Sequence, residues 1–529
     1  MAATKLVSGG PIYTMAGSPH ARTEAMLVCN GKVAATGRKT DLEAAAPRGT
    51  EMIDLAGRAV FPGMHDSHIH LVGWSLARRQ VDLIKTKTID EALVILRKSV
   101  AAVPPGEWIT GGRWDMSLWN VFPNYQQLDS VCPGSPVFLS SKDGHSGWAN
   151  SLAMKIAGVT EETEAPPGGS IMRDSEGRIT GVFQDRAQAL IRQHIPAPSE
   201  EAVVDALRAG IKHLVSIGLT TVHSVDGARA FRAAQALQQQ GALAMRIAAC
   251  PSVEALQQLK DVGLRQGFGN DSVFLGPVKM FKDGALGSRT AHMLEPYEKP
   301  PLTLGLEVMT NDQLTDAVSL AIGSRFAVAV HAIGDRACRD VLDVLERFAA
   351  ESRHLGLRHR MEHAQVLTEV DVPRFARLGV IASVQPSHAV ADRYMADKDW
   401  GKRARWAYPF ESLRKSGAVL AFGSDGPVDN PDPVYGIHCA VNRNAPGEPA
   451  ELSWYPQEKM GVLDAAWAYT AGASYAIGRE AVQGDLSPGK LADFIILSRD
   501  IAAIPKQEIT SAKVLATAVG GEFVFGPVW

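Results

Sequence analysis

Cysteine is scarce in this chain, and the few that occur do not form a disulfide or metal-binding pattern. The 529 residues include five cysteines, Cys29, Cys132, Cys250, Cys338 and Cys439. They are odd in number and far apart, and no two have the CxxC spacing. This pattern excludes a disulfide scaffold and a cysteine-rich zinc site as organising features, and it favours a reducing, cytoplasmic location.

Long apolar runs, low-complexity tracts and an excess of one charge are also missing. No run approaches the roughly 18 apolar residues of a membrane-spanning helix, and the N-terminus MAATKLVSGGPIYTMAG lacks the regions of a signal peptide. The formal net charge is −3, so we expect no surface for nucleic acid or anionic membrane. A small molecule is the expected partner, and a homodimer is the default assembly of a soluble enzyme.

The length and the two chain ends indicate several domains. A chain of 529 residues, 46% hydrophobic and 21% charged, suggests two or three folded units with a sizeable core. Short β-like runs separated by glycine and asparagine fill both ends, as in AMLVCNGKVAATG and LADFIILSRD. Because chain termini commonly lie near each other, we predict that residues 1–60 and 475–529 form one small β-rich domain.

The middle of the chain alternates short β-branched runs with helical stretches. Eight strand-like runs occur, at 58–70, 219–225, 244–252, 272–284, 326–335, 358–365, 379–388 and 418–426. Alternation of this kind predicts a parallel sheet, and eight units predict a TIM-like (β/α)₈ barrel over residues 61–474. The stretch after the first strand is much longer than a barrel connection needs, so we predict an inserted subdomain at 75–200.

The predicted insertion is rich in tryptophan. Trp108, Trp114, Trp119 and Trp148 could line an apolar pocket, but aromatic residues of an insertion more often form its own small core. We favour the core.

Polar side chains follow most of the predicted strands. His68 and His70 are two residues apart, so on a strand both imidazoles point to one face. Because the chemistry of such barrels lies at the C-terminal ends of the strands, the polar residues there should meet at one rim. They are Asp66, His68, His70, Lys279, Asp283, His331, His363 and Asp425. Imidazole and carboxylate are ligands of Zn, Mn or Fe, and a bound metal lowers the pKa of water toward about 7.

Lys279 allows two interpretations. It could be a structural lysine paired with Asp283 or Asp425. Alternatively, a desolvated lysine near a metal has a depressed pKa, and its neutral amine could add CO₂ to become a carbamate that bridges two metals.

Further residues are candidates for catalysis or for loop structure. Asp425 in GSDGP is either a turn residue or, as we favour, the general acid and base. His145 could polarise a carbonyl or order its loop, Arg289 could contact substrate or order its own loop, and His388 could line a pocket.

The ordered motifs HDSHIH, GGRWDMSLWN, DGHSGWANS, VKMFKDGALGSRTA, VQPSH, GSDG and SPGKLADFIILSRD resemble the amidohydrolase superfamily. Within it they resemble amidohydrolase family 3, the branch of YtcJ-like hydrolases and N-substituted formamide deformylase. The resemblance covers essentially the whole chain. It implies a distorted metal-binding barrel and a small β-sandwich domain built from both chain ends.

The resemblance also implies a ligand set. His68, His70 and Asp425 would bind a first metal, usually zinc, and His331 and His363 a second. A carbamylated Lys279 would bridge them, since VKMFKDG places Lys279 rather than Lys282 at the lysine of the branch. A mononuclear site of His68, His70 and either Asp425 or His331 is the alternative.

From these residues we predict a metal-dependent hydrolase that cleaves a non-peptide C–N bond of a small, apolar or aromatic amide. A deaminase or an esterase of the same superfamily is the alternative. Deaminases usually carry a glutamate near the fifth-strand histidine, which AVAVHAIGDRA lacks, and Glu362 should face away as the neighbour of His363. A barrel that binds metal and ligand as a regulatory protein, without turnover, is an alternative from another class.

Overall fold

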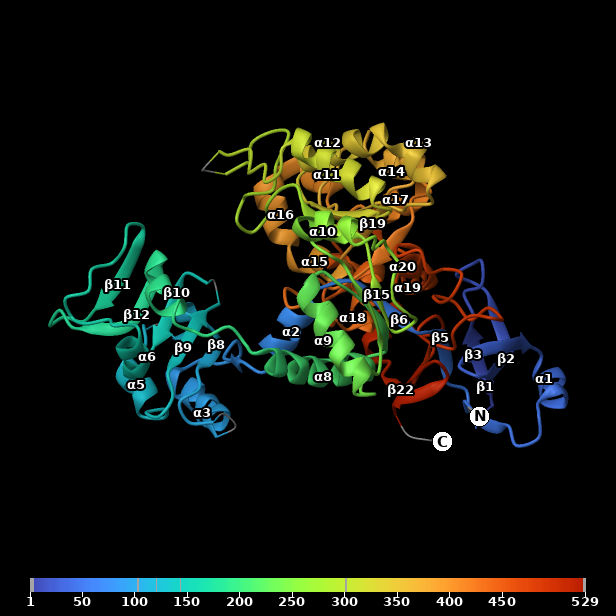
Figure 1. Cartoon of the computed structure of the whole chain (residues 1–529), viewed down its shortest axis with the longest axis horizontal. Coiled ribbons are helices and arrows are strands. Elements are labelled where there is room, and N and C mark those ends of the chain that lie inside the picture. The colour runs from blue at the N-terminus through green and yellow to red at the C-terminus, as the bar shows by residue number, and fades with distance from the viewer. Residues whose placement is uncertain (1–3, 102–103, 120, 143, 300–301, 527–529) are drawn as a thin grey trace. The chain divides into compact units, whose positions relative to one another are not determined.

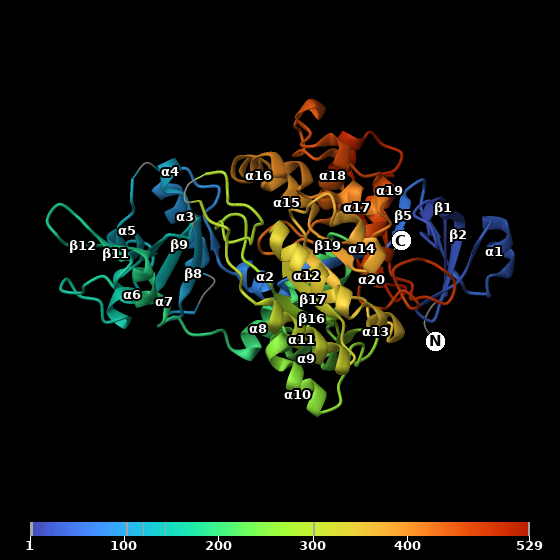
Figure 2. The same cartoon turned by 90° about the horizontal axis from the view of Figure 1, so that it is seen from above.

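The protein is described by a computed structural model that covers residues 4–101, 104–119, 121–142, 144–299 and 302–526. These residues form two compact units, one of Met1–Trp74 with Leu207–Trp529 and one of Ser75–Ala206 (Figures 1 and 2). Each unit contains its own sheet and its own buried core.

In the described part of the chain, no helix has both the length and the apolar character needed to cross a membrane.

One sheet of the larger unit draws on both ends of the chain. β5 (Ala59–Pro62) pairs antiparallel with β21 (Phe494–Leu497), and the sheet has the order β23-β22-β21-β5-β1-β2-β3, with β4 beside β1. Its other strands are β1 (Lys5–Tyr13), β2 (Arg22–Cys29), β3 (Lys32–Gly37), β4 (Glu51–Asp54), β22 (Val514–Val519) and β23 (Glu522–Phe525). The pairing forms one eight-stranded sheet, so the two-layered β-sandwich stays a prediction.

The middle strands form two parallel sheets. Their orders are β15-β14-β13-β6 and β16-β17-β18-β19-β20. The strands are β6 (Met64–Ile69), β13 (Leu219–Ser224), β14 (Arg246–Ala249), β15 (Val273–Leu275), β16 (Val278–Phe281), β17 (Val328–Ala332), β18 (Arg360–His363), β19 (Ile381–Val384) and β20 (Leu420–Phe422). The parallel α/β arrangement that the alternation predicted is therefore confirmed.

The predicted strand at 272–284 is in fact two strands, one in each parallel sheet. Gly276 and Pro277 separate β15 from β16, and proline has no N–H to donate to a ladder. Backbone hydrogen bonds link the sheets at their edges: Lys279 N donates to Pro251 O at 2.8 Å, and Asp425 N to His68 O at 2.7 Å. The ladders do not form a closed ring, so a closed barrel stays a prediction.

Helices follow the parallel strands and pack around them (Figures 1 and 2). Helix α11 begins with a capping box, in which Thr310 accepts from Gln313 N and the Gln313 side chain accepts from Thr310 N. The helices of this unit are α1 (Lys39–Ala45), α9 (Ala228–Gln239), α10 (Leu256–Asp261), α11 (Asn311–Gly323), α12 (Asp335–Arg347), α13 (Ala349–His354), α14 (Val372–Leu378), α15 (Pro386–Ala391), α16 (Arg393–Trp400), α17 (Phe410–Lys415), α18 (Pro433–Asn442), α19 (Val462–Ala468) and α20 (Ala471–Tyr475). The limits between the two units fall within α2 (Leu71–Ala77) and α8 (Glu200–Ser216).

The unit Ser75–Ala206 is a mixed sheet of order β11-β12-β10-β9-β8-β7 with short helices. Its strands are β7 (Val81–Asp82), β8 (Ile109–Trp114), β9 (Val137–Ser141), β10 (Ser146–Ala149), β11 (Gly169–Arg173) and β12 (Ile179–Asp185). Its helices are α3 (Ile89–Val100), α4 (Met116–Trp119), α5 (Tyr125–Asp129), α6 (Ser151–Ile156) and α7 (Ala189–Arg192).

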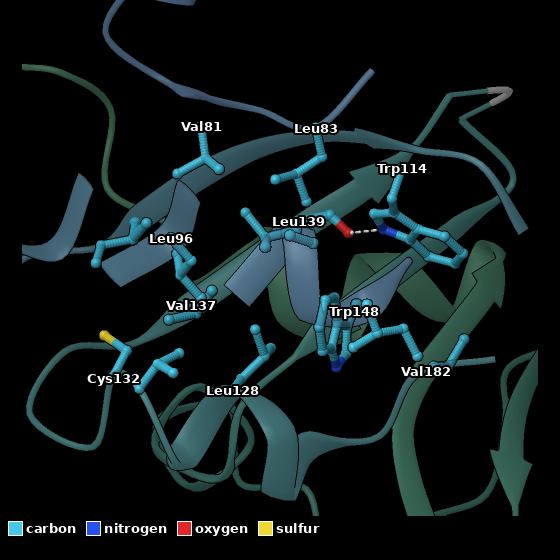
Figure 3. Close-up of a cluster of buried hydrophobic side chains, with 14 of the residues drawn as sticks. Val81, Leu83, Leu96, Trp114, Leu128, Cys132, Val137, Leu139, Trp148 and Val182 are labelled. Atoms are coloured by element: carbon cyan, nitrogen blue, oxygen red, sulfur yellow. Dashed lines mark hydrogen bonds between the residues drawn. The ribbon is translucent and has the colours of Figure 1, made fainter. Parts of the chain in front are cut away.

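The tryptophans of this unit form its core. Trp114, Trp119 and Trp148 are buried in one apolar cluster, where Trp114 Nε1 donates to Leu139 O at 2.8 Å (Figure 3). Trp108 is partly buried and packs against a second cluster of the same unit. The core interpretation is confirmed for Trp114, Trp119 and Trp148, whereas Trp108 also lines a pocket of this unit.

Candidate metal centre

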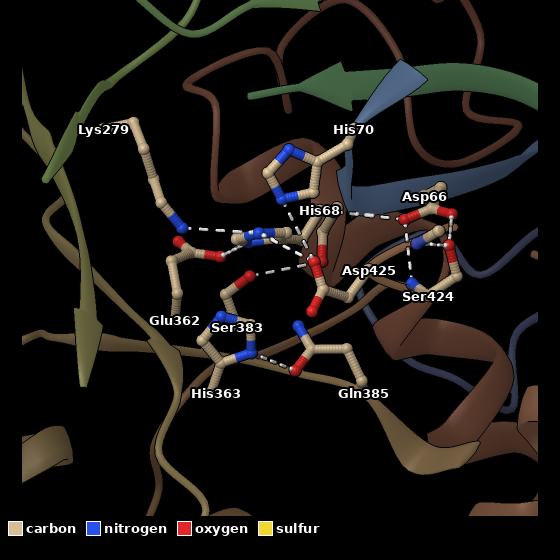
Figure 4. Close-up of polar contacts among 12 residues, drawn as sticks. Asp66, His68, His70, Lys279, Glu362, His363, Ser383, Gln385, Ser424 and Asp425 are labelled. Carbon is tan, nitrogen blue, oxygen red and sulfur yellow. Dashed lines mark hydrogen bonds and ion pairs between the residues drawn. The ribbon is translucent and has the colours of Figure 1, made fainter. Parts of the chain in front are cut away.

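Four histidines and an aspartate converge at the C-terminal ends of β6, β17, β18 and β20. Figure 4 shows His68, His70, His363 and Asp425 of this cluster. Asp425 Oδ1 lies 3.5 Å from His68 Nε2 and 3.5 Å from His70 Nε2. The ring of His363 lies 4.9 Å from that of His68 and 4.6 Å from that of His331, between centroids. The structure thus brings together five of the eight polar residues that the strand ends predicted: His68, His70, His331, His363 and Asp425.

The position of Asp425 is set by the backbone at the end of β20. Its φ of 58° is in the left-handed region, and its N–H donates to His68 O at 2.7 Å. The preceding Ser424 is held by Asp66, which accepts from Ser424 N at 3.0 Å and from Ser424 Oγ at 2.5 Å. Asp66 therefore joins β6 to the β20 loop, and it points away from the histidine cluster (Figure 4).

The Asp425 carboxylate is buried among imidazoles. Burial by itself would raise its pKa, but contact with His70 and the nearby rings of His68 and His363 outweigh burial and hold the pKa well below its usual range. Its Oδ1 is buried, with no hydrogen-bond partner among the described residues. Burying an acceptor without a hydrogen-bond partner lowers the stability of the fold, unless a further group binds that atom.

Lys279 points from β16 into the same cluster. Its Nζ lies 3.4 Å from His68 Nε2 and 4.6 Å from the centroid of the Phe281 ring. Burial lowers the pKa of Lys279 to about 8. Across the described residues it forms no ion pair with Asp283 or Asp425, which does not support the structural pairing considered for it.

Lys282 belongs to a different environment. Its Nζ donates to Glu307 Oε1 at 2.6 Å, to Asn311 Oδ1 at 2.7 Å and to Met309 O at 2.8 Å. The nearby Asp283 accepts backbone hydrogen bonds, among them one from Gly334 N at 2.8 Å. Lys282 is thus occupied by a structural network, whereas Lys279 faces the histidines.

The second pair of histidines is neutral. Burial, reinforced by the charge of Lys279, lowers the pKa of His331 to about 3, and burial lowers that of His363 well below its usual value. His331 Nε2 donates to Gly284 O at 2.9 Å, and His363 Nδ1 lies 2.8 Å from Gln385 Oε1. Neutral imidazole is the form that coordinates metals.

The side chain of Glu362 points in a different direction from the one expected from the sequence. Strand alternation predicted that it faces away from the site, yet its Oε2 lies 2.5 Å from His68 Nδ1. The alternation fails because His363, at the strand end, has φ 75°, which turns its side chain out of the regular pattern. Glu362 therefore contacts His68 from behind, whereas His363 lines the cavity.

The sequence left the role of His388 open, and it gave no indication that Gln385 belongs to the site. His388 Nε2 is buried with no partner among the described residues, and the His388 and His363 rings stack at 6.4 Å. Only the motif VQPSH following β19 signalled them, and it did not indicate what they contact.

The donor set fits a divalent cation. The groups His68, His70, Asp425 and His363, His388, Asp425 each offer three nitrogen and oxygen atoms within 4.8 Å of one another. Two of these donors, Asp425 Oδ1 and His388 Nε2, are buried atoms without a hydrogen-bond partner in the described structure. Imidazoles combined with a carboxylate are typical ligands of zinc and its neighbours.

A cavity of about 440 Å³ opens at this cluster. The wall beyond the cluster is mainly apolar. It is formed by Phe281, Ala285, Leu286, Gly287, Ile333, Ala391, Met395 and Val428, with Gln365, Asp392 and Asp429 as polar members. Such a cavity suits a small ligand with an apolar body and one polar reacting group.

The two other predicted catalytic residues, His145 and Arg289, each contact an aspartate. His145 belongs to the unit Ser75–Ala206, where its exposed ring lies 2.8 Å from Asp185 Oδ1. Arg289 is not among the residues that line the cavity, and its guanidinium donates twice to Asp399, at 2.8 and 3.2 Å. The Arg289 contacts favour the loop role, and a part in catalysis stays a prediction for both residues.

Comparison with known proteins gives consistent matches over almost the whole chain. The profile of the Amidohydrolase family matches residues 51–525. Protein LONG AFTER FAR-RED 3 of Arabidopsis thaliana is 36% identical, over 98% of this chain and 91% of that protein. Putative amidohydrolase YtcJ of Bacillus subtilis is 33% identical over 98% of both chains, and N-substituted formamide deformylase of Arthrobacter pascens is 27% identical over 94% of both.

A solved structure is also similar. An uncharacterized metal-dependent hydrolase from Pyrococcus horikoshii superposes with a TM-score of 0.80 at 29% identity, covering 95% of this chain and 99% of that one.

Proposed function

The chain belongs to the amidohydrolase family, and from this premise we propose that it uses a divalent metal to cleave the C–N bond of a small apolar or aromatic amide. The family and branch indicated by the sequence motifs are confirmed by the profile and by the two named bacterial relatives. The observation that carries the proposal is the cluster around Asp425, whose buried, unpartnered Oδ1 faces two imidazoles at 3.5 Å beside an apolar cavity.

The chain offers ligands for two ions. His68, His70 and Asp425 would hold the first, and His363 with Asp425 and either His331 or His388 would hold the second. When bound, a zinc ion would polarise the substrate carbonyl and make hydroxide available at neutral pH.

Lys279 is the proposed bridging residue. Its buried Nζ lies 3.4 Å from a proposed ligand and forms no ion pair with any described carboxylate. A neutral lysine amine adds CO₂ to give a carbamate and one released proton. The product is an anion with two oxygens, which suits a position between two cations better than an ammonium does.

Asp425 is the proposed general acid and base. Its carboxylate would accept a proton from the attacking water and deliver it to the leaving nitrogen, which leaves as an amine while the acyl group becomes a carboxylic acid. The apolar body of the substrate would lie against Phe281, Leu286, Ile333 and Met395. One name among the relatives, N-substituted formamide deformylase, agrees with a small amide substrate.

The deaminase alternative gains no support from Glu362. A deaminase needs a glutamate that reaches the substrate, whereas Glu362 is fully buried against His68 and Arg360 and is not among the residues that line the cavity.

The test is amine release from a panel of N-benzylformamide, N-acylanilines and matched esters, with the protein as purified, after chelation, and after addition of Zn²⁺. We expect amide cleavage that chelation abolishes and Zn²⁺ restores, with unchanged circular dichroism. The H70N variant should lose this activity, and H20N, at an exposed histidine, should keep it. Cleavage of the esters alone, or turnover that survives complete metal removal, would overturn the proposal, and tight ligand binding with no turnover would support the regulatory barrel instead.

A further inference from the structure

A carboxylate and a guanidinium are buried directly behind His68. Glu362 and Arg360 are two residues apart on β18, so their side chains share a face, and both are fully buried. Arg360 donates to Glu362 from Nε and from Nη2. The second carboxylate oxygen of Glu362 lies 2.5 Å from His68 Nδ1 (Figure 4). The charge of Glu362 is thus compensated by Arg360, and its remaining acceptor capacity is directed at one imidazole.

Arg360 is itself fixed from two other strands. Its Nη2 donates to Ser67 O on β6, and its Nη1 lies 2.9 Å from His223 Nδ1 on β13. Guanidinium is a donor only, so His223 Nδ1 accepts and His223 is neutral. These contacts hold the Arg360–Glu362 pair against the strand that carries His68. The Glu362 carboxylate therefore has a single position available.

The contact also defines the tautomer of His68. A carboxylate accepts, so Nδ1 of His68 carries the proton and donates it, and Nε2 keeps its lone pair. That Nε2 faces the cluster, 3.5 Å from Asp425 Oδ1 and 3.4 Å from Lys279 Nζ.

We infer that Glu362, held by Arg360, is a positioning residue that fixes His68 as an Nε2 metal ligand and increases the basicity of its imidazole. A carboxylate on the non-ligating nitrogen of a histidine orients the ring and strengthens the metal bond. The inference rests on the proposed metal function of the site and adds to it a buried ion pair outside the ligand set.

A purely structural role is the competing explanation, because the same pair ties β18 to β6 and β13. The two explanations differ in what they change. A structural link affects the free energy of unfolding of the metal-free protein and leaves Zn²⁺ affinity unaltered in any variant that folds. A positioning residue changes Zn²⁺ affinity in the folded protein.

The experiment measures the Zn²⁺ dissociation constants of the full-length, metal-free protein by competition with a chelating dye, together with its thermal unfolding. The variants are E362Q, which retains the side-chain shape, and R360M/E362M. Should E362Q fail to fold because Arg360 is left unpaired, the double variant carries the test, since apolar replacement of a buried ion pair is commonly tolerated. The matched control is E458Q, since Glu458 is also a buried carboxylate and accepts from Ser412 N at 2.9 Å.

We expect Zn²⁺ affinity to fall about 10- to 100-fold in folded E362Q and in R360M/E362M, and to be unchanged in E458Q. Wild-type affinity in either folded Glu362 variant would overturn the inference and leave the pair a structural link. Failure of the wild-type protein to bind Zn²⁺ at all would instead overturn the proposed metal function, so the two failures are distinguishable.

Discussion

Asp425 is the residue on which the proposed chemistry depends most. Its left-handed backbone places a charged carboxylate among the imidazoles of His68, His70 and His363, and its Oδ1 forms no hydrogen bond in the described structure. Nothing in its local sequence distinguishes it from a turn aspartate; the neighbouring strands do so, by bringing His68 and His70 to its side.

Replacement of Asp425 by asparagine should lower kcat for amide hydrolysis by about 10²- to 10⁴-fold, because the general acid and base is lost. The D425N protein should still fold, since the amide fills the same volume without burying a charge. Steady-state kinetics with D343N, at an exposed aspartate on α12, provides the control. Wild-type turnover by D425N would remove Asp425 from the mechanism.

His359 predicts a pH dependence of stability that does not involve the metal centre. Burial lowers its pKa to about 4, and it accepts a hydrogen bond from Val328 N at 3.1 Å while Nε2 donates to Ser352 Oγ at 2.7 Å. The unfolded chain takes up a proton below its ordinary pKa near 6.5, whereas the folded protein does not until about pH 4. His359 therefore stabilises the fold above pH 6.5, and this contribution is lost as the pH falls from 6.5 to 4.

The free energy of unfolding of the metal-free protein should decrease over that pH range, with His359 accounting for a loss on the order of 3 kcal/mol. Urea unfolding of wild-type and H359Q proteins at pH 7 and pH 5 measures this contribution. H359Q should show a smaller difference between the two pH values than the wild type. An equal difference in both proteins would contradict the assignment.

The residues of the site that lie at strand ends could be predicted from the sequence, whereas a residue placed by an irregular backbone angle could not. His68, His70, His331, His363 and Asp425 end apolar runs, and the common edge of parallel strands brings such ends together. Glu362 was misplaced because period-two alternation does not apply next to a residue with positive φ, and the sequence gives no direct sign of that φ.

At the scale of elements, the same limit applies to the strand around Lys279. The apolar run at 272–284 reads as one strand, but Gly276 and Pro277 divide it between two sheets. Proline at that position was a visible signal of interruption. The sequence did not indicate which strands pair with the two halves, because β15 pairs with β14 and β16 pairs with β17, which are distant in sequence.

The segment after β16 is held by Lys282, and we expect this anchor to support the cavity. Lys282 is fully buried and donates to Glu307, Met309 and Asn311, which secures the segment that carries Leu286 in the cavity wall. K282M should lower the free energy of unfolding by about 1–3 kcal/mol, because Glu307, Met309 and Asn311 lose their shared donor, while the Glu307 carboxylate is exposed enough to be solvated.

Urea unfolding measures that loss, and limited proteolysis should show faster cleavage of K282M between residues 284 and 299. The control is K415M, since Lys415 is exposed and Glu411 keeps its two hydrogen bonds from Arg414 when Lys415 is replaced. A K282M protein as stable and as resistant as the wild type would show that other contacts hold the segment.

At the scale of the whole molecule, the larger unit depends on pairing between the two chain ends. β5 and β21 are neighbours in one sheet although more than four hundred residues separate them, and the buried Arg246 of β14 donates to Asp493 at 2.6 and 2.8 Å. The β-like character of both ends was predictable from the sequence. Their register was not, since no local signal specifies a partner at that distance.

The proposed hydrolysis requires that the histidine cluster binds divalent metal, so the metal content per chain is the first quantity to measure. The protein would be purified without added metal, in bicarbonate buffer, and analysed for zinc, manganese and iron beside an H68N/H70N variant. We expect about two ions per wild-type chain, as in two-metal hydrolytic sites, and a loss of metal in the variant. A folded wild-type protein that holds no metal and takes up none when Zn²⁺ is added would contradict the proposed hydrolysis.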